Sequence, residues 1–99
     1  MVKEIKEKDF NDVIKNGNVL IDCYATWCGP CRMLSPILDE ISNEESTYKF
    51  YKLDVDESSN IAKEYKIMSI PTILLFNDGK LKETVVGLKS KNEIKELLK

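Results

Sequence analysis

The stretch Val19-Leu20-Ile21-Asp22-Cys23-Tyr24, followed closely by Trp27-Cys28-Gly29-Pro30-Cys31, determines the fold that we predict. The first part places apolar residues on both alternating faces, which is typical of a central strand covered on two sides. In the second part, Pro30 suits the first turn of a helix, because a backbone N–H there has no partner to lose. The chain is therefore expected to pass from a buried strand into a helix at the two cysteines.

The spacing of Cys28 and Cys31 indicates which chemistry the chain can perform. Residues three apart on a helix share a face, so the two sulfurs can meet. A helix N-terminus has unpaired N–H groups and the positive end of the helix dipole, and both favour a thiolate. A Cys-x-x-Cys pair beside a strand–helix unit indicates a redox-active dithiol. The alternative is that both cysteines are small buried hydrophobic residues.

The rest of the chain alternates helix and strand patterns without repeats or linkers. We predict a first helix that buries Phe10, Val13 and Ile14, and a second helix that buries Met33, Leu34, Ile37, Leu38 and Ile41. A short third helix is expected over 60–65. Strands are expected over 48–55, 72–76 and 81–86. Asn77-Asp78-Gly79 predicts a hairpin turn, and the capping box Ser90-Lys91-Asn92-Glu93 opens a last helix that buries Ile94, Leu97 and Leu98. These patterns predict one α/β domain over 1–99, with a mixed sheet of parallel strands that ends in an antiparallel hairpin.

Composition and charge exclude several classes of function. The chain has 99 residues, 15 basic against 17 acidic and interspersed, so no clustered basic surface for nucleic acid is expected. The charged start, Met1-Val2-Lys3-Glu4-Ile5-Lys6, has no apolar segment typical of a signal peptide. The apolar runs are strand-sized, far below the ~20 residues that span a bilayer. We therefore expect a cytoplasmic protein with no membrane partner, and a monomer, because no long exposed apolar stripe is evident.

The count of histidines and cysteines narrows the chemistry further. The chain has no histidine, which excludes Ser-His and Cys-His mechanisms and every mixed Cys/His zinc site. Three cysteines are too few for a Cys₄ zinc site. We predict no metal.

The chain resembles the thioredoxin family over nearly its whole length. The blocks that carry the resemblance are Trp27-Cys28-Gly29-Pro30-Cys31, Val19-Leu20-Ile21-Asp22, Lys52-Leu53-Asp54-Val55-Asp56, Ser69-Ile70-Pro71-Thr72 and Gly87. The resemblance implies a thioredoxin fold with helices on both faces of the sheet, and a Cys28–Cys31 disulfide that opens and closes. It also implies a protein-disulfide reductase without a bound cofactor. Its partners would be disulfide-containing target proteins and a thioredoxin reductase that supplies electrons from NADPH.

Asp22 is the candidate proton acceptor. A carboxylate inside an apolar strand is costly when charged, so burial should raise its pKa. The resemblance implies that Asp22 lies under the dithiol and accepts the proton of Cys31, and that Lys52 approaches it from the neighbouring strand and tunes it. The alternatives are a buried aspartate with satisfied hydrogen bonds and an ordinary surface lysine.

The resemblance also implies a groove for the target. In the family pattern, a cis Ile70–Pro71 bond would lie beside the sulfurs, and the backbone at Ile70 would pair with an extended target segment. Trp27 and Gly87 would complete the groove. The alternatives are a core position for Trp27 and a simple turn at Gly87. Cys28 is expected to attack from the exposed helix end, and the more enclosed Cys31 to resolve.

Two further features concern the direction of the reaction and its surroundings. Gly29 and Pro30 bring no charge between the cysteines, which favours a weakly stabilised thiolate and a reducing role. Tyr24 stands where many thioredoxins have tryptophan, and Cys23, on the strand face opposite Asp22, is expected to be a buried hydrophobic residue.

Two other functions stay open: an oxidase or isomerase of the same fold, and a binding subunit whose dithiol is incidental.

Overall fold

A computed structural model describes all residues, Met1–Lys99, and contains a five-stranded mixed sheet. The strands are β1 (Lys3–Ile5), β2 (Asn18–Tyr24), β3 (Tyr48–Asp54), β4 (Thr72–Asn77) and β5 (Lys80–Val86), in the order β1-β3-β2-β4-β5. β1, β3 and β2 run parallel, whereas β4 is antiparallel to both β2 and β5. The predicted combination of parallel strands and a C-terminal antiparallel hairpin is confirmed.

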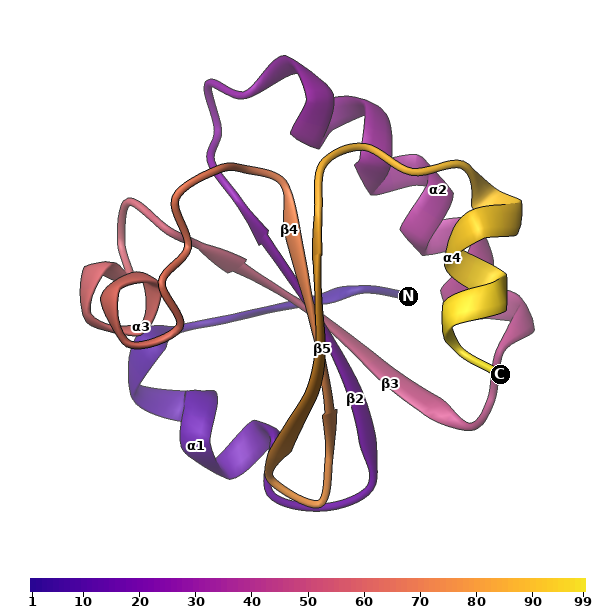
Figure 1. Ribbon diagram of the computed structural model, residues 1–99, viewed down its shortest axis with the longest axis horizontal. Coiled ribbons are helices and arrows are strands. Elements are labelled where there is room, and N and C mark those ends of the chain that lie inside the picture. The colour runs from indigo at the N-terminus through magenta and orange to yellow at the C-terminus, as the bar shows by residue number, and fades with distance from the viewer.

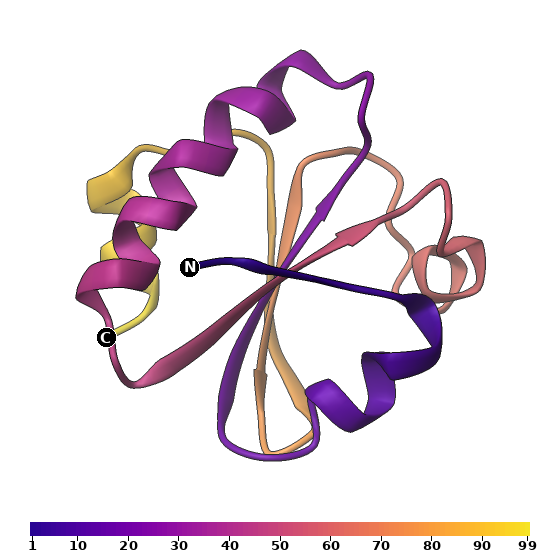
Figure 2. The same ribbon diagram turned by 180° about the vertical axis from the view of Figure 1, so that it is seen from behind.

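Helices cover both faces of the sheet, as Figure 1 and the opposite view in Figure 2 show. The short 3-10 helix η1 (Glu7–Asp9) leads into α1 (Phe10–Val13), which shares one face with α3 (Ser59–Glu64). The other face carries α2 (Gly29–Glu44) and α4 (Lys91–Leu97). None of these helices combines the length and the hydropathy that a membrane-spanning helix needs.

β2 lies at the centre of the sheet and supplies both hydrophobic cores. Val19, Ile21 and Cys23 pack with α1 and α3, whereas Leu20 packs with α2 and α4. Alternation along a strand produces this division, because successive side chains leave opposite faces. The expectation that Cys23 is a buried hydrophobic residue is confirmed, since it is fully enclosed in the first core. Its burial, with the negative charge of Asp22, raises the pKa of the thiol.

Two local predictions, the hairpin turn after β4 and the capping box of α4, are also confirmed. Asp78 and Gly79 both have positive φ, as a two-residue hairpin between twisted strands requires. The side chain of Ser90 accepts a hydrogen bond from the Glu93 N–H and the side chain of Glu93 accepts one from the Ser90 N–H, which completes the capping box of α4.

The structure differs from the sequence-based expectations in two places. No strand was expected before Phe10, yet β1 pairs with β3 at the edge of the sheet. This strand has three residues and only Ile5 is buried, which is too short and too polar for a periodic pattern. Met33 was expected to face the core but is 62% exposed. The buried residues of α2 are Cys31, Leu34, Leu38 and Ile41, and Met33 lies one residue outside that helical stripe.

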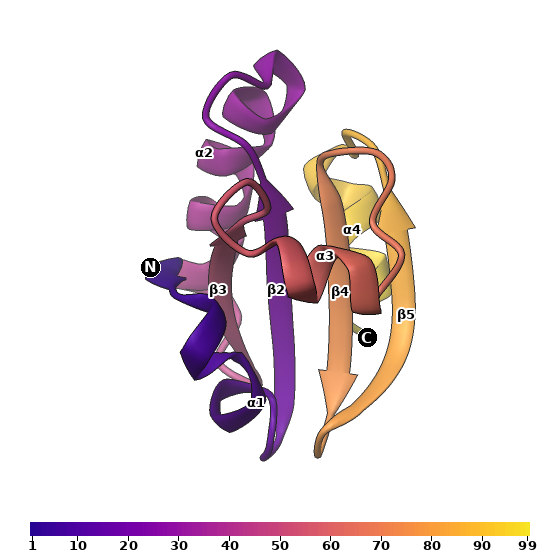
Figure 3. The same ribbon diagram turned by 90° about the vertical axis from the view of Figure 1, so that its left-hand side faces the viewer.

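The register of β2 and β4 brings the two halves of the candidate site together. Cys23 pairs with Thr72, so the end of β2 lies beside the start of β4 (Figure 3). Pro71 therefore enters the sheet next to the point where β2 leaves it for α2. Residues far apart in sequence meet at this edge because the strands are antiparallel.

Candidate active site

The two cysteines form a disulfide at the N-terminus of α2. Their Cα atoms lie 5.2 Å apart. Cys28 is the N-cap residue, and its Sγ accepts a hydrogen bond from the Cys31 N–H at 3.2 Å. Pro30 lies in the first turn, as the sequence predicted. The same N–H and the helix dipole can stabilise negative charge on Cys28 once the disulfide opens.

The expected difference in exposure between the two cysteines is wrong for this disulfide form, because each is only 3% exposed. Both pack in a small cluster with Ala25, and Val55 and Ile70 lie against it. The Ile70 carbonyl oxygen is 3.9 Å from Cys28 Sγ. A segment 42 residues away along the chain therefore covers Cys28, which helix position alone could not indicate.

The segment around Pro71 is held by hydrogen bonds to its backbone carbonyls. The Ile70–Pro71 peptide bond is cis, the isomer that the resemblance implied. The Gly87 N–H donates to the Pro71 carbonyl at 2.8 Å, and the Thr72 hydroxyl donates to the Ser69 carbonyl. Gly87 has a φ of +96°, a conformation that favours glycine, so the turn expected as the alternative role is present.

Asp22 lines the pocket behind Cys31. It is 3% exposed, and its buried Oδ1 has no hydrogen-bond partner. Burial raises the pKa of Asp22 from 3.8 to about 7, and the positive charge of Lys52 opposes part of that rise. Asp22, Cys31, Ser35 and Lys52 line a common pocket of about 190 Å³. The alternative of an aspartate with satisfied hydrogen bonds is therefore wrong for Oδ1.

Lys52 is directly opposite Asp22 in the pairing of β2 with β3. Its ammonium belongs to none of the chain's ion pairs and instead lies 5.8 Å from the centre of the Tyr24 ring. A cation at this distance from a ring centre is attracted by the ring electrons. The Tyr24 hydroxyl donates in turn to the Glu4 carboxylate on β1. Burial and the hydrogen bond to Glu4 raise the pKa of Tyr24. Tyr24 was expected only as a departure from the tryptophan of many thioredoxins, and its contacts with Lys52 and Glu4 are not evident from the sequence.

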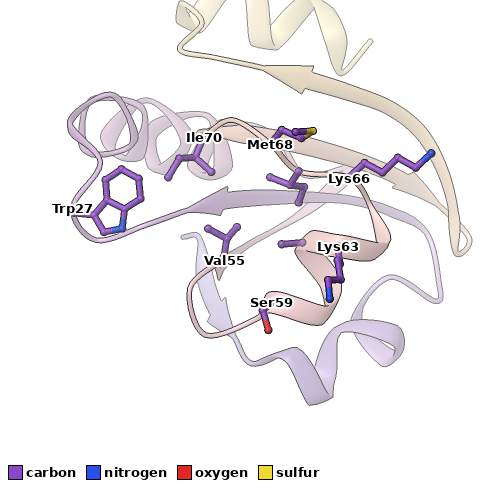
Figure 4. A pocket seen from close by; sticks show the side chains of 9 residues that line it. Trp27, Val55, Ser59, Lys63, Lys66, Met68 and Ile70 are labelled. Carbon is purple, nitrogen blue, oxygen red and sulfur yellow. The ribbon is translucent and has the colours of Figure 1, made fainter.

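Trp27 is 68% exposed, so the alternative of a core position is wrong. The indole Nε1 donates to the Asp56 carboxylate at 2.8 Å. Trp27 and Ile70 line a cavity of about 570 Å³, together with Val55, Ile67 and Met68 (Figure 4). Gly87, which was expected to complete the groove, does not line this cavity.

The disulfide therefore borders two different spaces. An acid and a lysine lie behind Cys31, and an apolar cavity opens beside the Ile70 segment that covers Cys28. The structure brings together no group of three or more metal-ligating side chains. The chemistry available at this point is thiol–disulfide exchange with a nearby group that can hold a proton.

Comparison with known proteins identifies the family. The thioredoxin family model matches residues 1–99. The thioredoxin of Listeria monocytogenes is 44% identical over 99 residues, which is 99% of this chain and 96% of that protein. The thioredoxin of Mycoplasmoides gallisepticum is 48% identical over 84 residues, 85% of this chain and 84% of that one. A mutant thioredoxin from Halobacterium salinarum superposes with a TM-score of 0.89 at 38% identity, covering 96% of this chain and 85% of that chain.

These matches span almost the full length of the chain and include the paired cysteines, which the structure joins as a disulfide. The protein is an oxidoreductase of protein disulfides, as thioredoxins are. With its fold, its Cys28–Cys31 disulfide and its relatives in agreement, the chain belongs to the thioredoxin family.

Proposed function

We propose that the chain reduces disulfides in target proteins, with Cys28 as the nucleophile, Cys31 as the resolving thiol and Asp22 as the proton acceptor. The observation that carries this assignment is the unequal environment of the two sulfurs. Cys28 Sγ accepts a helix N–H, whereas Cys31 shares a pocket with an unpartnered carboxylate oxygen. A thiolate is the attacking species in exchange, so the sulfur at the N-cap is the better first nucleophile.

In the first step, the Cys28 thiolate attacks one sulfur of the target disulfide. A new S–S bond joins Cys28 to the target, and the target's own S–S bond breaks. The departing target sulfur leaves as a thiolate and takes a proton from solvent. The N–H of Cys31 and the dipole of α2 support the charge on Cys28 before the attack.

In the second step, Cys31 loses its proton to Asp22 and attacks Cys28 Sγ. The Cys28–Cys31 bond forms, the mixed disulfide breaks, and the second target sulfur leaves reduced. Two electrons have then passed from the chain to the target. The raised pKa of Asp22, about 7, supports this role, because a base works best when its pKa lies near the working pH. Lys52 keeps that pKa from rising further.

Target binding is assigned to Trp27, Ile70, Pro71 and Gly87. Trp27 and Ile70 contribute apolar surface at the cavity, and the chain at Ile70 can pair with an extended target segment. The proposed role of Gly87 is indirect: its N–H holds the Pro71 carbonyl, and so fixes the segment beside Cys28.

The proposed direction of electron flow is toward the target. Gly29 and Pro30 add no charge near Cys28, so the residues between the cysteines add nothing to the stabilisation that the helix N-terminus gives its thiolate. A weakly stabilised thiolate favours the disulfide form and therefore a reducing protein. A thioredoxin reductase that draws on NADPH would restore the dithiol, and the protein would act in the cytoplasm as a monomeric single domain.

Catalysed reduction of insulin disulfides with dithiothreitol as the electron source tests this proposal. We expect acceleration by the native chain and none by Cys28→Ser or Cys31→Ser. Cys23→Ala is the matched control, since it removes a cysteine outside the site, and it should keep the acceleration. The redox potential against glutathione tests the direction, because an oxidase would equilibrate at a markedly higher potential. No acceleration by the native chain would overturn the proposal.

A further inference from the structure

The apolar cavity lies beside the cluster that holds the disulfide and extends along α3. Trp27 lies at one end and Lys66 at the other, with the end of α3 along one side (Figure 4). Val55 and Ile70 line the cavity and also pack against the Cys28–Cys31 cluster. A segment of a target that reaches Cys28 therefore lies close enough to place a neighbouring side chain in this cavity. Its volume of about 570 Å³ falls in the ordinary range of ligand pockets, roughly 300–1,000 Å³.

The charged residues that line this cavity are all positive. Lys63 and Lys66 line it, and none of its nine lining residues is acidic. Both lysines are exposed, and neither takes part in an ion pair or in a side-chain hydrogen bond. Asp56 keeps its negative charge while it accepts the indole N–H of Trp27, but it does not line the cavity. The cavity thus combines an apolar floor with two unpaired positive charges.

Lys66 occupies a backbone position that favours glycine. α3 ends in a pair of hydrogen bonds, from the Ile67 N–H to the Ala62 carbonyl and from the Lys66 N–H to the Lys63 carbonyl. This pattern is the Schellman motif, whose left-handed residue is usually glycine. Lys66 adopts it with a φ of +54°. A lysine at a strained backbone position beside a cavity points to a role for its side chain.

We infer that the cavity is a specificity site for target segments that carry a large apolar side chain next to an acidic one. The apolar side chain enters between Trp27, Ile70 and Met68, and the carboxylate pairs with Lys63 or Lys66. This inference rests on the proposed function, because the segment must belong to a protein whose disulfide reaches Cys28. Charge complementarity selects the occupant: a basic segment would meet two like charges, and a neutral one would gain nothing from them.

Helix stability offers a competing explanation for the two lysines. Positive side chains near a helix C-terminus interact favourably with the helix dipole, and Lys63 lies in the last turn of α3. That explanation predicts an effect on unfolding and none on the choice of target. Lys66→Gly separates the two, since glycine suits the left-handed position and should leave thermal stability unchanged or raised.

The test uses two matched sets of disulfide peptides. Each peptide carries one Phe and either Glu or Gln, placed about three to six residues from the reactive cysteine, which spans the cavity in extended chain. The rate constant for reduction is measured with the pre-reduced protein at low salt. We expect at least one placement at which the Glu peptide reacts about threefold faster than its Gln partner, the size typical of exposed charge pairs. That ratio should approach one in about 0.5 M salt, because screening weakens exposed pairs.

Variants of Lys63 and Lys66 test whether these two lysines cause the difference in rate between the Glu and Gln peptides. The ratio should fall toward one in the double variant Lys63→Gln, Lys66→Gly, and should fall below one in Lys63→Glu, Lys66→Glu. Lys49→Gln is the matched control, an exposed lysine at the far end of β3, and it should keep both the ratio and the rates. A ratio of one at every placement, or a ratio that survives the double variant, overturns the inference while the proposed function stands. If no peptide of either set is reduced, the proposed function itself fails.

Discussion

The two sides of the Cys28–Cys31 disulfide differ in almost every physical property. Behind Cys31 lies a pocket of about 190 Å³, which Asp22 and Lys52 line from neighbouring strands. On the side of the Ile70 segment, a cavity of about 570 Å³ opens to solvent and is mostly apolar. One side can hold a proton and the other can hold a target. A single bond can thus serve two half-reactions, because its two sulfurs meet different surroundings.

The difference arises from the kinds of element that build each side. The polar pair comes from the regular part of the sheet, where β2 and β3 fix Asp22 opposite Lys52. The cavity is lined instead by connecting segments around Trp27 and Ile70, and by one face of α3. Strand pairing can hold a buried charge in place, whereas loops provide exposed surface that is free to meet a partner.

The largest expected effect separates the two sulfurs. Cys31→Ser should lose turnover and accumulate a covalent complex with target at Cys28, because the first step proceeds and the second cannot. Cys28→Ser should also lose turnover but form little complex, since only the sulfur at position 28 accepts the helix N–H that stabilises an attacking thiolate. Non-reducing electrophoresis and intact mass measure both outcomes. Equal trapping by the two variants would mean that the sides do not differ in this way.

The next effect concerns the buried acid. Asp22 has a folded-state pKa of about 7 against an unfolded value near 3.9, so the folded chain holds a proton that the unfolded chain releases between these pH values. Stability contributed by protonated Asp22 is complete below about pH 4 and is lost as pH rises toward 7. Asp22→Asn removes this loss. Relative to the native chain, the variant should gain about 4 kcal/mol between pH 4 and pH 8.

Denaturant unfolding of the disulfide form at the two pH values measures this gain without interference from thiol titration. Asp9→Asn is the control, since Asp9 is an exposed acid outside the site. A gain of the same size in Asp9→Asn, or none in Asp22→Asn, would contradict the assignment of a proton to Asp22. The variant should also slow release of the target from the mixed disulfide.

A smaller effect is expected on the open side. Trp27→Ala should lower kcat/KM for protein disulfides about tenfold, because exposed tryptophans at binding surfaces contribute strongly to affinity. Its free energy of unfolding should change by less than about 1 kcal/mol, since the side chain is mostly exposed. Leu81→Ala, an exposed apolar residue of the hairpin, is the control and should keep kcat/KM. An equal loss in both variants would assign the effect to general surface changes.

The smallest effect tests how Lys52 acts on Asp22. Lys52 lowers the pKa of Asp22 without forming an ion pair, so its removal should raise that pKa modestly. In Lys52→Gln, the pH midpoint of the resolving step should shift upward by about half a unit. Single-turnover release of target across pH measures the midpoint, with Lys49→Gln as a control from the same strand. A downward shift would show that Lys52 does not act through its charge.

Patterns that involve only a few neighbouring residues were enough to predict much of this structure. Alternation in β2 placed Asp22 and Cys23 on opposite faces and predicted that both are buried. The proline and the Cys-x-x-Cys spacing predicted the start of α2, and the capping box predicted the start of α4. These features follow from the sequence because strand alternation, helix periodicity and capping are local.

The sequence by itself thus determined the redox pair, the buried acid and the order of the strands and helices from Phe10 onward, but not β1. Only the tertiary structure decided that Cys28 is covered by Ile70, that Trp27 bonds to Asp56, and that Lys52 lies over Tyr24 instead of pairing with Asp22. Each of these contacts joins residues that are distant in sequence. No local pattern encodes them, because they depend on which segments the sheet brings to the same edge.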